Sequence, residues 1–378
     1  MEQMKTNHIL KIGGRIMLGL IIAILICMVI LAGAVFMKSS NKATPFLDKS
    51  GNVIEDSISE KLFVEINGVK QGMFIKGKDK TKPVLLFLHG GPGVTEQWIN
   101  QIYPSGIEDE FVVCWWEQRG AGVSYSKDIP VQTITSEQLV LDTIEVTNYL
   151  RERFGKEKIY LLGHSWGSTL GVYAAEMAPE LYYAYIGMGQ VAYHSQSQKT
   201  AYDYMLDYYT KSGDKKMVKK LLKVSHTMEN PSSEDFEKIS DEVIHKAGVG
   251  TTRDMKSIIT GVFIPSFFAS EYTVNEKINL WKGKWADYAR TMKQKMDVTD
   301  LSTAVTTFKV PVYFLHGKYD YTCAYPMAKD YLDKIDAPLK GFYTFEESAH
   351  SPMFEEPEKF MKIMREDVLN AENHLADK

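Results

Sequence analysis

The sequence predicts an α/β fold in which a mostly parallel sheet is covered by helices on both faces and carries a helical insertion. Short, continuously apolar runs alternate with longer segments of helical periodicity, and such runs are typical of parallel strands buried between two layers of helices. Between Met188 and Val310 about 120 residues pass without such a run, far more than a normal connection between a strand and a helix. The chain therefore combines one large α/β domain with an insertion.

The composition excludes several classes of protein. Of the 378 residues, 44% are hydrophobic and 24% are charged, which is an ordinary globular balance. Forty-four basic residues against 48 acidic ones give a net charge of -4, so no global positive field is present to hold nucleic acid. Cys27, Cys114 and Cys323 lie far apart without CxxC spacing, which excludes a disulfide scaffold and a cysteine-rich zinc site. We expect no nucleic-acid partner and no metal or organic cofactor.

The amino-terminal region, residues 1–37, predicts a membrane anchor. Residues 16–37 form an unbroken uncharged stretch of 22 positions, and about 20 apolar residues suffice for a helix to span a bilayer. The stretch is longer than the roughly 7–15 residues of a cleaved signal, which favours an uncleaved, single-pass anchor. Basic residues are slightly more numerous before it than after it, so the folded domain is expected on the extracytoplasmic side. The alternative is secretion after cleavage near Ala34.

After a polar linker over residues 38–56, the folded part begins with a hairpin. Leu62–Ile66 and Val69–Ile75 are predicted strands around Asn67-Gly68, because Asn-Gly supplies the positive φ angles of a two-residue turn. We expect this hairpin at the edge of the sheet. The remaining predicted strands are Val84–Leu88, Phe111–Trp116, Ile159–Leu162, Tyr183–Met188, Val310–Leu315 and Phe342–Phe345. Helical periodicity predicts a helix over Ser136–Phe154.

These elements divide the chain into a core and a lid. Residues 57–189 and 310–378 are expected to form the α/β core, and residues 190–309 a mostly helical lid. The lid is rich in tyrosine, phenylalanine and tryptophan, most of which we expect to pack inside the lid itself, with some facing the cleft between lid and sheet. It carries 18 basic and 15 acidic residues, so its average charge does not favour a cation.

The segment Gly163 to Ser168 has the sequence of a nucleophile elbow. It follows a predicted strand and opens a helical pattern, which is the context that this sharp turn requires. Small residues are needed at 163 and 167 because side chains there would collide with neighbouring backbone. Ser165 would then project its hydroxyl beyond the carboxyl end of the sheet, whereas His164 is expected to be structural.

A serine hydroxyl needs a base, and the base needs an orienting carboxylate. In folds with such an elbow the chain order is serine, acid, histidine. Asp320 follows the predicted strand Val310–Leu315, and His350 follows the predicted strand Phe342–Phe345. Of the nine histidines, only His350 lies after the final strand and before a terminal amphipathic helix, so Ser165, Asp320 and His350 are predicted to form a catalytic triad.

Two further segments are expected beside the site. His89-Gly90-Gly91-Pro92-Gly93 ends a predicted strand, and its glycines allow an amide hydrogen, that of Gly91, to point at a forming oxyanion. The amide of Trp166 is the expected partner donor. In the segment Trp116 to Ser124, Glu117 and Arg119 are interpreted as a network beside the site or as a structural ion pair.

Together these motifs resemble the α/β-hydrolase superfamily, and in particular its prolyl iminopeptidase-like branch. The matching segments, in that branch's order, are HGGPG at 89–93, EQRGAGVS at 117–124, GHSWGS at 163–168, GKYD at 317–320 and SAH at 348–350. The resemblance covers about 320 residues, everything after the linker. It implies the α/β-hydrolase fold, with Ser165 as nucleophile, Asp320 as acid, His350 as base, and Gly91 and Trp166 as oxyanion donors.

The resemblance also bears on the substrate. Members of this branch bind the free amine of the substrate with carboxylates of the lid, for which Glu229, Glu271 and Glu276 are candidates here. The sequence departs from the branch at Glu117, where aspartate is usual, and at Ala121, where cysteine is usual.

From these points we expect a membrane-anchored serine hydrolase that acts through an acyl-enzyme, as an aminopeptidase on short peptides. Two alternatives stay open. One is an esterase or amidase on small acyl substrates, and the other is a non-catalytic ligand-binding protein on the same fold, since a fold does not fix a function.

Overall fold

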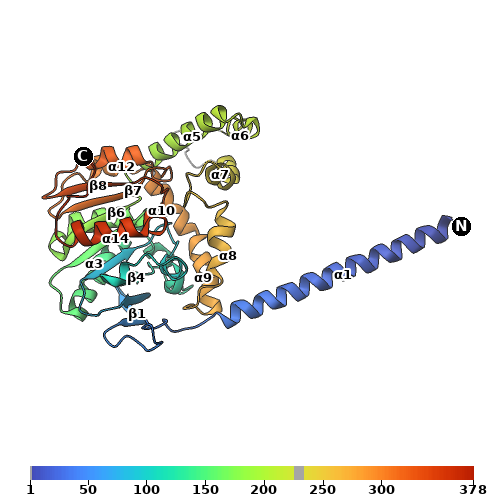
Figure 1. Ribbon diagram of the computed structural model, residues 1–378, viewed down its shortest axis with the longest axis horizontal. Helices are drawn as coiled ribbons and strands as arrows, with labels where there is room; N and C mark the ends of the chain where they lie inside the picture. The colour runs from blue at the N-terminus through green and yellow to red at the C-terminus, as the bar shows by residue number, and fades with distance from the viewer. Residues whose placement is uncertain (1, 225–233) are drawn as a thin grey trace.

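The computed structural model describes residues 2–224 and 234–378 and is built around one eight-stranded sheet. The strand order is β1-β2-β4-β3-β5-β6-β7-β8; β2 is antiparallel to both of its neighbours, and the pairs from β4 through β8 are parallel. Figure 1 shows helices packed around this sheet. The strands are β1 (Ile58–Ile66), β2 (Val69–Gly77), β3 (Val84–Leu88), β4 (Val112–Trp116), β5 (Ile159–His164), β6 (Tyr182–Met188), β7 (Val312–Gly317) and β8 (Lys340–Phe345).

The strands and the first long core helix agree with the sequence prediction. All predicted strands are present, β3 with its predicted bounds and the others with one or both ends shifted. As expected, β1 is the edge strand, and Asn67 and Gly68 have φ angles of 46° and 72°. Helix α3 (Ser136–Phe154) has the predicted bounds. The Thr135 side chain accepts a hydrogen bond from the Gln138 amide at its start, and Gly155 ends it in the left-handed conformation, so local capping fixes both ends.

Alternate residues of the central strands pack into two separate hydrophobic cores, one on each face of the sheet. In β3, Leu86 and Leu88 pack in one core and Leu85 and Phe87 in the other, because successive side chains point to opposite faces of a sheet. The first core includes residues of α3, α4 (Trp166–Met177) and α12 (Tyr325–Lys334). The second includes residues of α2 (Gln97–Ile102), α13 (Pro352–Glu355) and α14 (Pro357–Ile363). The central strands are thus buried on both faces.

The long segment between β6 and β7 is helical. Among the described residues it contributes no strand to the sheet, and it carries a π-helical turn at Ile259–Phe263. Its helices are α5 (His194–Lys211), α6 (Lys215–Leu221), α7 (Glu234–Lys246), α8 (Ile264–Ser266), α9 (Val274–Lys284), α10 (Asp287–Val298) and α11 (Leu301–Ala304). Residues of α5, α6 and α7 form a small core of their own. We call residues 190–309 the insertion; that it acts as a lid stays a prediction.

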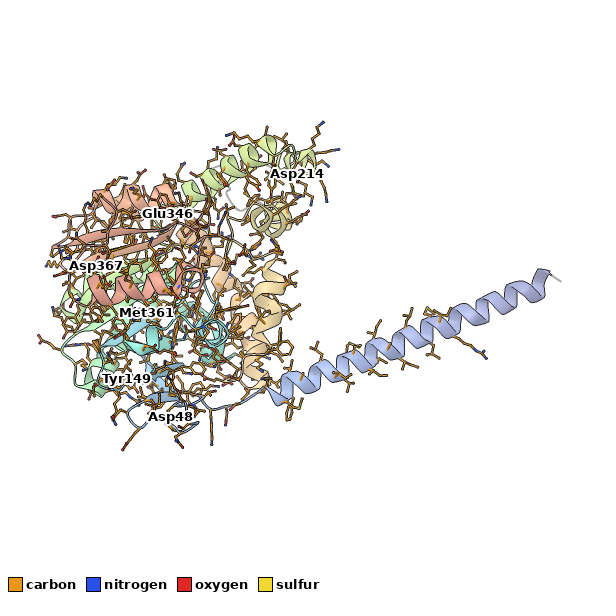
Figure 2. All side chains as sticks on the ribbon, in the orientation of Figure 1. Asp48, Tyr149, Asp214, Glu346, Met361 and Asp367 are labelled. Atoms are coloured by element: carbon orange, nitrogen blue, oxygen red, sulfur yellow. The ribbon has the colours of Figure 1, made fainter. Side chains whose placement is uncertain are left out.

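Helix α1 (Glu2–Met37) projects from the domain. Its segment Arg15–Met37 is 23 residues long, and the most apolar 18-residue window of that segment has a mean hydropathy of 3.1 and is not buried within the protein. At about 1.5 Å per residue such a helix is long enough to cross a bilayer, although a signal sequence meets the same criterion. Figure 2 shows the side chains drawn along the middle of this helix with no other part of the chain beside them.

The segment after α1, predicted as a linker, is docked on the insertion. The Ser40 amide donates to the Tyr272 carbonyl (3.2 Å) and the Thr44 amide donates to the Glu271 carboxylate (2.8 Å). The Lys277 ammonium donates to Ser39 Oγ (3.0 Å) and to the Val35 carbonyl at the end of α1 (3.3 Å). The junction between α1 and the domain is therefore held by specific hydrogen bonds.

Candidate active site

Ser165 lies on a sharp turn between β5 and α4. Its φ angle is 53° and its ψ angle is -123°, a conformation that costs a non-glycine residue about 1–3 kcal/mol and persists only when its surroundings enforce it. Hydrogen bonds hold the turn on both sides, from the Ser165 amide to the Met188 carbonyl (2.9 Å) and from the Ser168 amide to the Ser165 carbonyl (2.8 Å).

Two glycines make this turn possible. A Cβ atom on Gly163 would lie 2.5 Å from the Gly167 carbonyl oxygen, and one on Gly167 would lie 2.0 Å from the Leu88 carbonyl oxygen. Real Cβ atoms essentially never approach backbone so closely, so only glycine fits at either position. The turn is thereby pressed against the end of β3, where the HGGPG loop begins.

Asp320 and His350 are brought together from the ends of β7 and β8. His350 Nδ1 lies 2.8 Å from Asp320 Oδ2, and Asp320 Oδ1 accepts hydrogen bonds from the amides of Thr322 and Cys323, each at 2.9 Å. Asp320 is fully buried. Burial alone would raise the pKa of this carboxyl, but the charges and hydrogen bonds of His350 and His316 outweigh it and hold the pKa well below its ordinary value.

His316 is a second histidine on Asp320 that sequence reasoning missed. Its Nε2 lies 3.2 Å from Asp320 Oδ2 and 2.7 Å from the Cys323 carbonyl oxygen, and its side chain is completely buried. Because it touches the oxygen that His350 also contacts, it restrains the orientation of the carboxylate. Its place at the end of a buried strand, four residues before Asp320, was the available signal.

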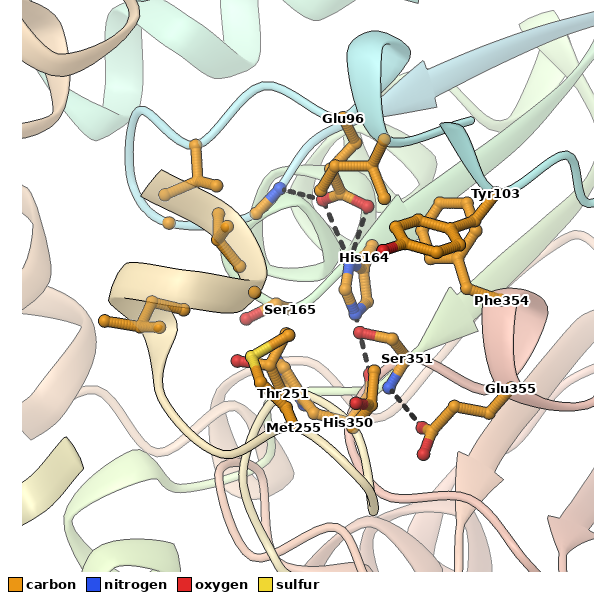
Figure 3. Close-up of a pocket in the computed structure, with 18 of the residues that line it drawn as sticks. Glu96, Tyr103, His164, Ser165, Thr251, Met255, His350, Ser351, Phe354 and Glu355 are labelled. Carbon is orange, nitrogen blue, oxygen red and sulfur yellow. Dashed lines mark hydrogen bonds and ion pairs between the residues drawn. The ribbon is translucent and has the colours of Figure 1, made fainter. Parts of the chain in front are cut away.

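Ser165 and His350 line the same cavity, which has a volume of about 890 Å³. This is the size expected of a small-molecule site. The described residues contain no hydrogen bond between the two side chains. Such contacts are often loose in a ligand-free enzyme and tighten only around substrate. Figure 3 shows Ser165 and His350 in this cavity.

His164 connects the turn to both of its neighbours. Its Nδ1 lies 2.8 Å from Glu96 Oε2, its Nε2 lies 2.8 Å from the His350 carbonyl oxygen, and Glu96 Oε1 accepts from the Gly90 amide (2.8 Å), as Figure 3 shows. Burial alone would lower the pKa of His164, but the Glu96 carboxylate outweighs it and raises the pKa. The structural role predicted for His164 fits this position, whereas Glu96 was not anticipated.

The amides of Gly91 and Trp166 are available as donors. Neither takes part in a hydrogen bond to any other described residue. Gly91 has a φ angle of 120°, which glycine tolerates and other residues rarely adopt, and it lines the cavity. A Cβ atom on its neighbour Gly90 would lie 3.1 Å from Ser165 Cβ, so this loop runs directly past the serine.

Gln118 ties the segment after β4 to this loop. Its side chain donates to the His89 carbonyl (3.0 Å) and accepts from Trp166 Nε1 (3.1 Å), while its backbone amide donates to His89 Nε2 (3.1 Å). His89 Nε2 is thus an acceptor and its Nδ1 donates to the Gly90 carbonyl (2.9 Å). Burial lowers the pKa of His89 to about 4, so the ring stays neutral.

Arg119 and Glu117, interpreted above as one network or ion pair, have different partners. Arg119 forms a buried bidentate pair with Asp142 of α3, Nε to Oδ2 at 2.7 Å and Nη2 to Oδ1 at 2.9 Å. Glu117 accepts from the Tyr272 hydroxyl and from the Val123 amide, and burial raises the pKa of Glu117 to about 7. Both therefore brace the framework behind the cavity.

Two of the three acids predicted to bind the substrate's amine, Glu271 and Glu276, lie outside the cavity. Glu271 is buried and binds Lys76 (2.6 Å) and the Gln97 side chain (2.7 Å), and Glu276 binds Lys61 (2.7 Å) and caps α9. Neither is a lining residue of the cavity. Glu229 lies outside the described residues.

Other carboxylates do line the cavity. Glu96 and Glu355 already have hydrogen-bond partners within the protein. Glu355 accepts from the amides of Arg253 (2.6 Å), Ala349 (3.0 Å) and Ser351 (3.3 Å). The exposed side chains of Asp254 and Glu347 line it without a hydrogen-bond partner among the described residues.

The cavity also carries a cation. Lys284 lines it, and burial lowers the pKa of its ammonium to about 8. The described residues hold no group of three or more His, Cys, Asp or Glu side chains arranged for a metal ion.

Comparison with known proteins identifies the family of this chain. Residues 83–214 match the family model described as alpha/beta hydrolase fold. The chain is 32% identical over 314 residues to the probable aminopeptidase YbaC of Bacillus subtilis, covering 82% of this chain and 96% of that protein. It is 25% identical over 313 residues to a proline iminopeptidase of Clostridioides difficile, covering 80% and 96%.

Among solved structures, a proline iminopeptidase-related protein from Thermus thermophilus superposes with a TM-score of 0.58 at 18% identity, covering 82% of this chain and 98% of that one. At this identity the likeness shows the shared fold. Fold, motif order and sequence identity agree, and the chain belongs to the α/β-hydrolase superfamily, in its prolyl iminopeptidase-like branch.

Proposed function

We propose that this protein is a membrane-anchored serine hydrolase with its domain on the extracytoplasmic side, and that it removes amino-terminal residues from short peptides. The observation that carries the proposal is that Ser165 and His350 line the same cavity. Ser165 has a positive φ angle, and His350 is hydrogen bonded to Asp320. Its relatives named aminopeptidase and proline iminopeptidase support the peptide substrate, and the apolar helix α1 supports the anchor.

In this proposal His350 is the general base. Its Nδ1–H donates to Asp320, which leaves Nε2 free to take the proton of Ser165 as Oγ attacks the scissile carbonyl carbon. The buried Asp320 carboxylate stabilises the imidazolium that forms. His350 then gives the proton to the leaving amine, and water hydrolyses the acyl-enzyme by the same steps in reverse order.

The amides of Gly91 and Trp166 stabilise the negative charge that develops on the carbonyl oxygen. Neither amide is used within the described chain, and both adjoin the serine turn. Donors fixed before the reaction begins stabilise the developing charge without reorganisation, and losing one costs about 10²–10³-fold in rate.

The charges of the cavity support a short peptide with both ends free. Asp254 and Glu347 are the lining carboxylates without a described partner, and we assign them to the ammonium end of the substrate. Lys284 suits the carboxylate end, because a partly buried cation gains from an anionic partner.

One observation favours esterase or amidase action as the second candidate. Glu271 and Glu276, the described lid acids suggested by the resemblance, are held by lysines outside the cavity. An acyl substrate without an amine would not need them.

Amino-acid anilides with free and acetylated amino groups distinguish these functions. For the aminopeptidase, acetylation should lower kcat/KM at least about 100-fold, because the carboxylates that bind the amine are left unpaired. Equal hydrolysis of the acetylated substrate, or activity confined to acyl esters, would establish the second candidate. The Ser165→Ala variant is the control, and it should lose turnover by on the order of 10⁶-fold.

A fluorophosphonate probe tests the serine without knowledge of the substrate. An activated Ser165 should be labelled in the native chain and not in Ser165→Ala. Failure of the folded native protein to react would support a non-catalytic binding protein on this fold.

A further inference from the structure

The insertion presents an apolar surface beside the point where α1 leaves the domain. Four side chains on α9 and just beyond it, Val274, Ile278, Trp281 and Trp285, follow the i, i+4, i+7, i+11 spacing of one helix face. Val274 is 38% exposed, Ile278 41% and Trp285 66%. Trp281 is partly buried and lines the cavity, so the exposed part of this stripe is Val274, Ile278 and Trp285.

A second segment extends the stripe sideways. Phe263 contacts Trp281 and Trp285, with ring centroids 4.7 and 5.7 Å apart, and its neighbours Ile259 and Ile264 are 55% and 47% exposed. We define the insertion face as Ile259, Phe263, Ile264, Val274, Ile278 and Trp285. Single exposed apolar residues are common on proteins, but a continuous group of this kind marks a contact surface.

Hydrogen bonds between the insertion and the end of α1 place the insertion face close to the apolar helix. Lys277, in the first turns of α9, donates to Ser39 and to the carbonyl of Val35 in the last turn of α1, and Ser40 donates to Tyr272. No spacer separates the apolar helix from the domain. Figure 1 shows α8 and α9 on the side of the domain from which α1 leaves.

We infer that the insertion face rests on the bilayer that holds α1, at the boundary between headgroups and acyl chains. The inference rests on the proposed membrane anchoring and not on the proposed hydrolase activity. A domain hydrogen bonded to the last turn of a spanning helix cannot stand away from the membrane surface. Tryptophan is enriched at this depth because its ring is apolar and its N–H is polar, and apolar faces of this type sit about 5–10 Å into the boundary.

The same segments form a wall of the cavity on their inner side. Ile258, Gly261 and Val262 line it from the π-helical region, and Trp281 and Lys284 line it from α9. The proposed contact with lipid and the wall of the cavity are therefore two sides of one layer.

The test places an environment-sensitive fluorophore on single cysteines of the full chain. Ile259→Cys and, on α3 at the other side of the domain in Figure 1, Leu141→Cys are made in a Cys27→Ala background; Cys114 and Cys323 are buried. Leu141, 47% exposed, is the matched control for Ile259. Each protein is labelled in detergent and placed in phosphatidylcholine vesicles with or without nitroxide on the upper acyl chain.

Nitroxide lipid should remove at least about half of the fluorescence at position 259 and leave position 141 unchanged, because only a side chain within the boundary region lies beside the quencher. The native chain labelled at Cys27 reports on α1 itself. Quenching at Cys27 without quenching at position 259 would overturn the inference while the anchor stands. Absence of quenching at both would overturn the anchor and the inference together. If Ile259→Cys does not fold, Trp285→Cys takes its place.

Discussion

Replacing Gly167 by alanine tests the geometry of the serine turn. The new Cβ atom would lie 2.0 Å from the carbonyl oxygen of Leu88, 2.6 Å from its carbonyl carbon and 2.8 Å from the carbonyl oxygen of His89. All three are backbone atoms at the end of β3, so no side-chain rotation relieves the collision. Opening the shortest contact from 2.0 Å to the 3.4 Å of ordinary van der Waals contact requires the first turn of α4 to move by about 1.4 Å.

That movement separates the two halves of the site. Ser165 and the Trp166 amide travel with α4, whereas Gly91 and its loop stay with β3. A misplacement of about 1 Å in an active site costs on the order of 10²-fold in rate, so the reactivity of Ser165 should fall at least about 100-fold. Overpacking adds a loss of stability of roughly 1–3 kcal/mol.

The rate constant for labelling by a fluorophosphonate measures this loss for the full chain in detergent, with circular dichroism to show that the variant is folded. Gly171→Ala is the matched control in the same helix. The three atoms nearest to its Cβ all belong to the Tyr185 ring, the closest at 2.5 Å, so it should lower stability and leave labelling near the native rate. A folded Gly167→Ala protein labelled at the native rate would refute the reasoning.

Three further predictions concern charges. Asp142→Ala leaves the buried guanidinium of Arg119 unpaired and should lower the free energy of unfolding by about 3–5 kcal/mol in chemical denaturation; a loss below about 1 kcal/mol, as for an exposed pair, would contradict this. His164 has a raised pKa in the folded protein, so its ion pair with Glu96 stabilises fully below the ordinary value of 6.5 and loses that effect as the pH rises through the folded pKa. The native chain should therefore exceed His164→Gln in unfolding free energy by more near pH 6 than near pH 9, and a difference independent of pH would argue against a charged pair. Lys284→Met should lower kcat/KM for peptides with a free carboxyl end by about 10–100-fold, since a hydrogen bond to a charged group is worth about 1.5–3 kcal/mol. Carboxyl-amidated peptides should be unaffected, and an equal loss for both would remove Lys284 from substrate binding.

The fold could be predicted because its signals are local. Each central strand is buried on both faces and reads as an apolar run, and Asn67-Gly68 specifies its own turn. The loops that follow β7 and β8 begin at the same edge of a parallel sheet, which is why chain order sufficed to select Asp320 and His350 as neighbours.

The partners of these residues could not be predicted because they come from distant parts of the chain. Glu96 meets His164 across 68 positions of sequence, and no pattern around either residue encodes that contact. Glu271 was a candidate amine ligand because the sequence around it gives no sign of another partner for its carboxylate. In the structure that carboxylate is paired with the buried Lys76 of β2, which lies 195 positions earlier in the chain.

The backbone of the insertion helps to hold the loop of His350. The His350 amide donates to the Gly250 carbonyl (3.3 Å), and the Arg253 amide donates to Glu355, which also accepts from the amides on either side of His350. On the insertion side both contacts use main-chain atoms only. The side chains of Thr251 and Thr252, which line the cavity between these two contacts, can therefore change, and with them the cavity wall, as long as the path of the chain is kept. A graft of this segment from a relative should be chosen by backbone course and not by residue identity.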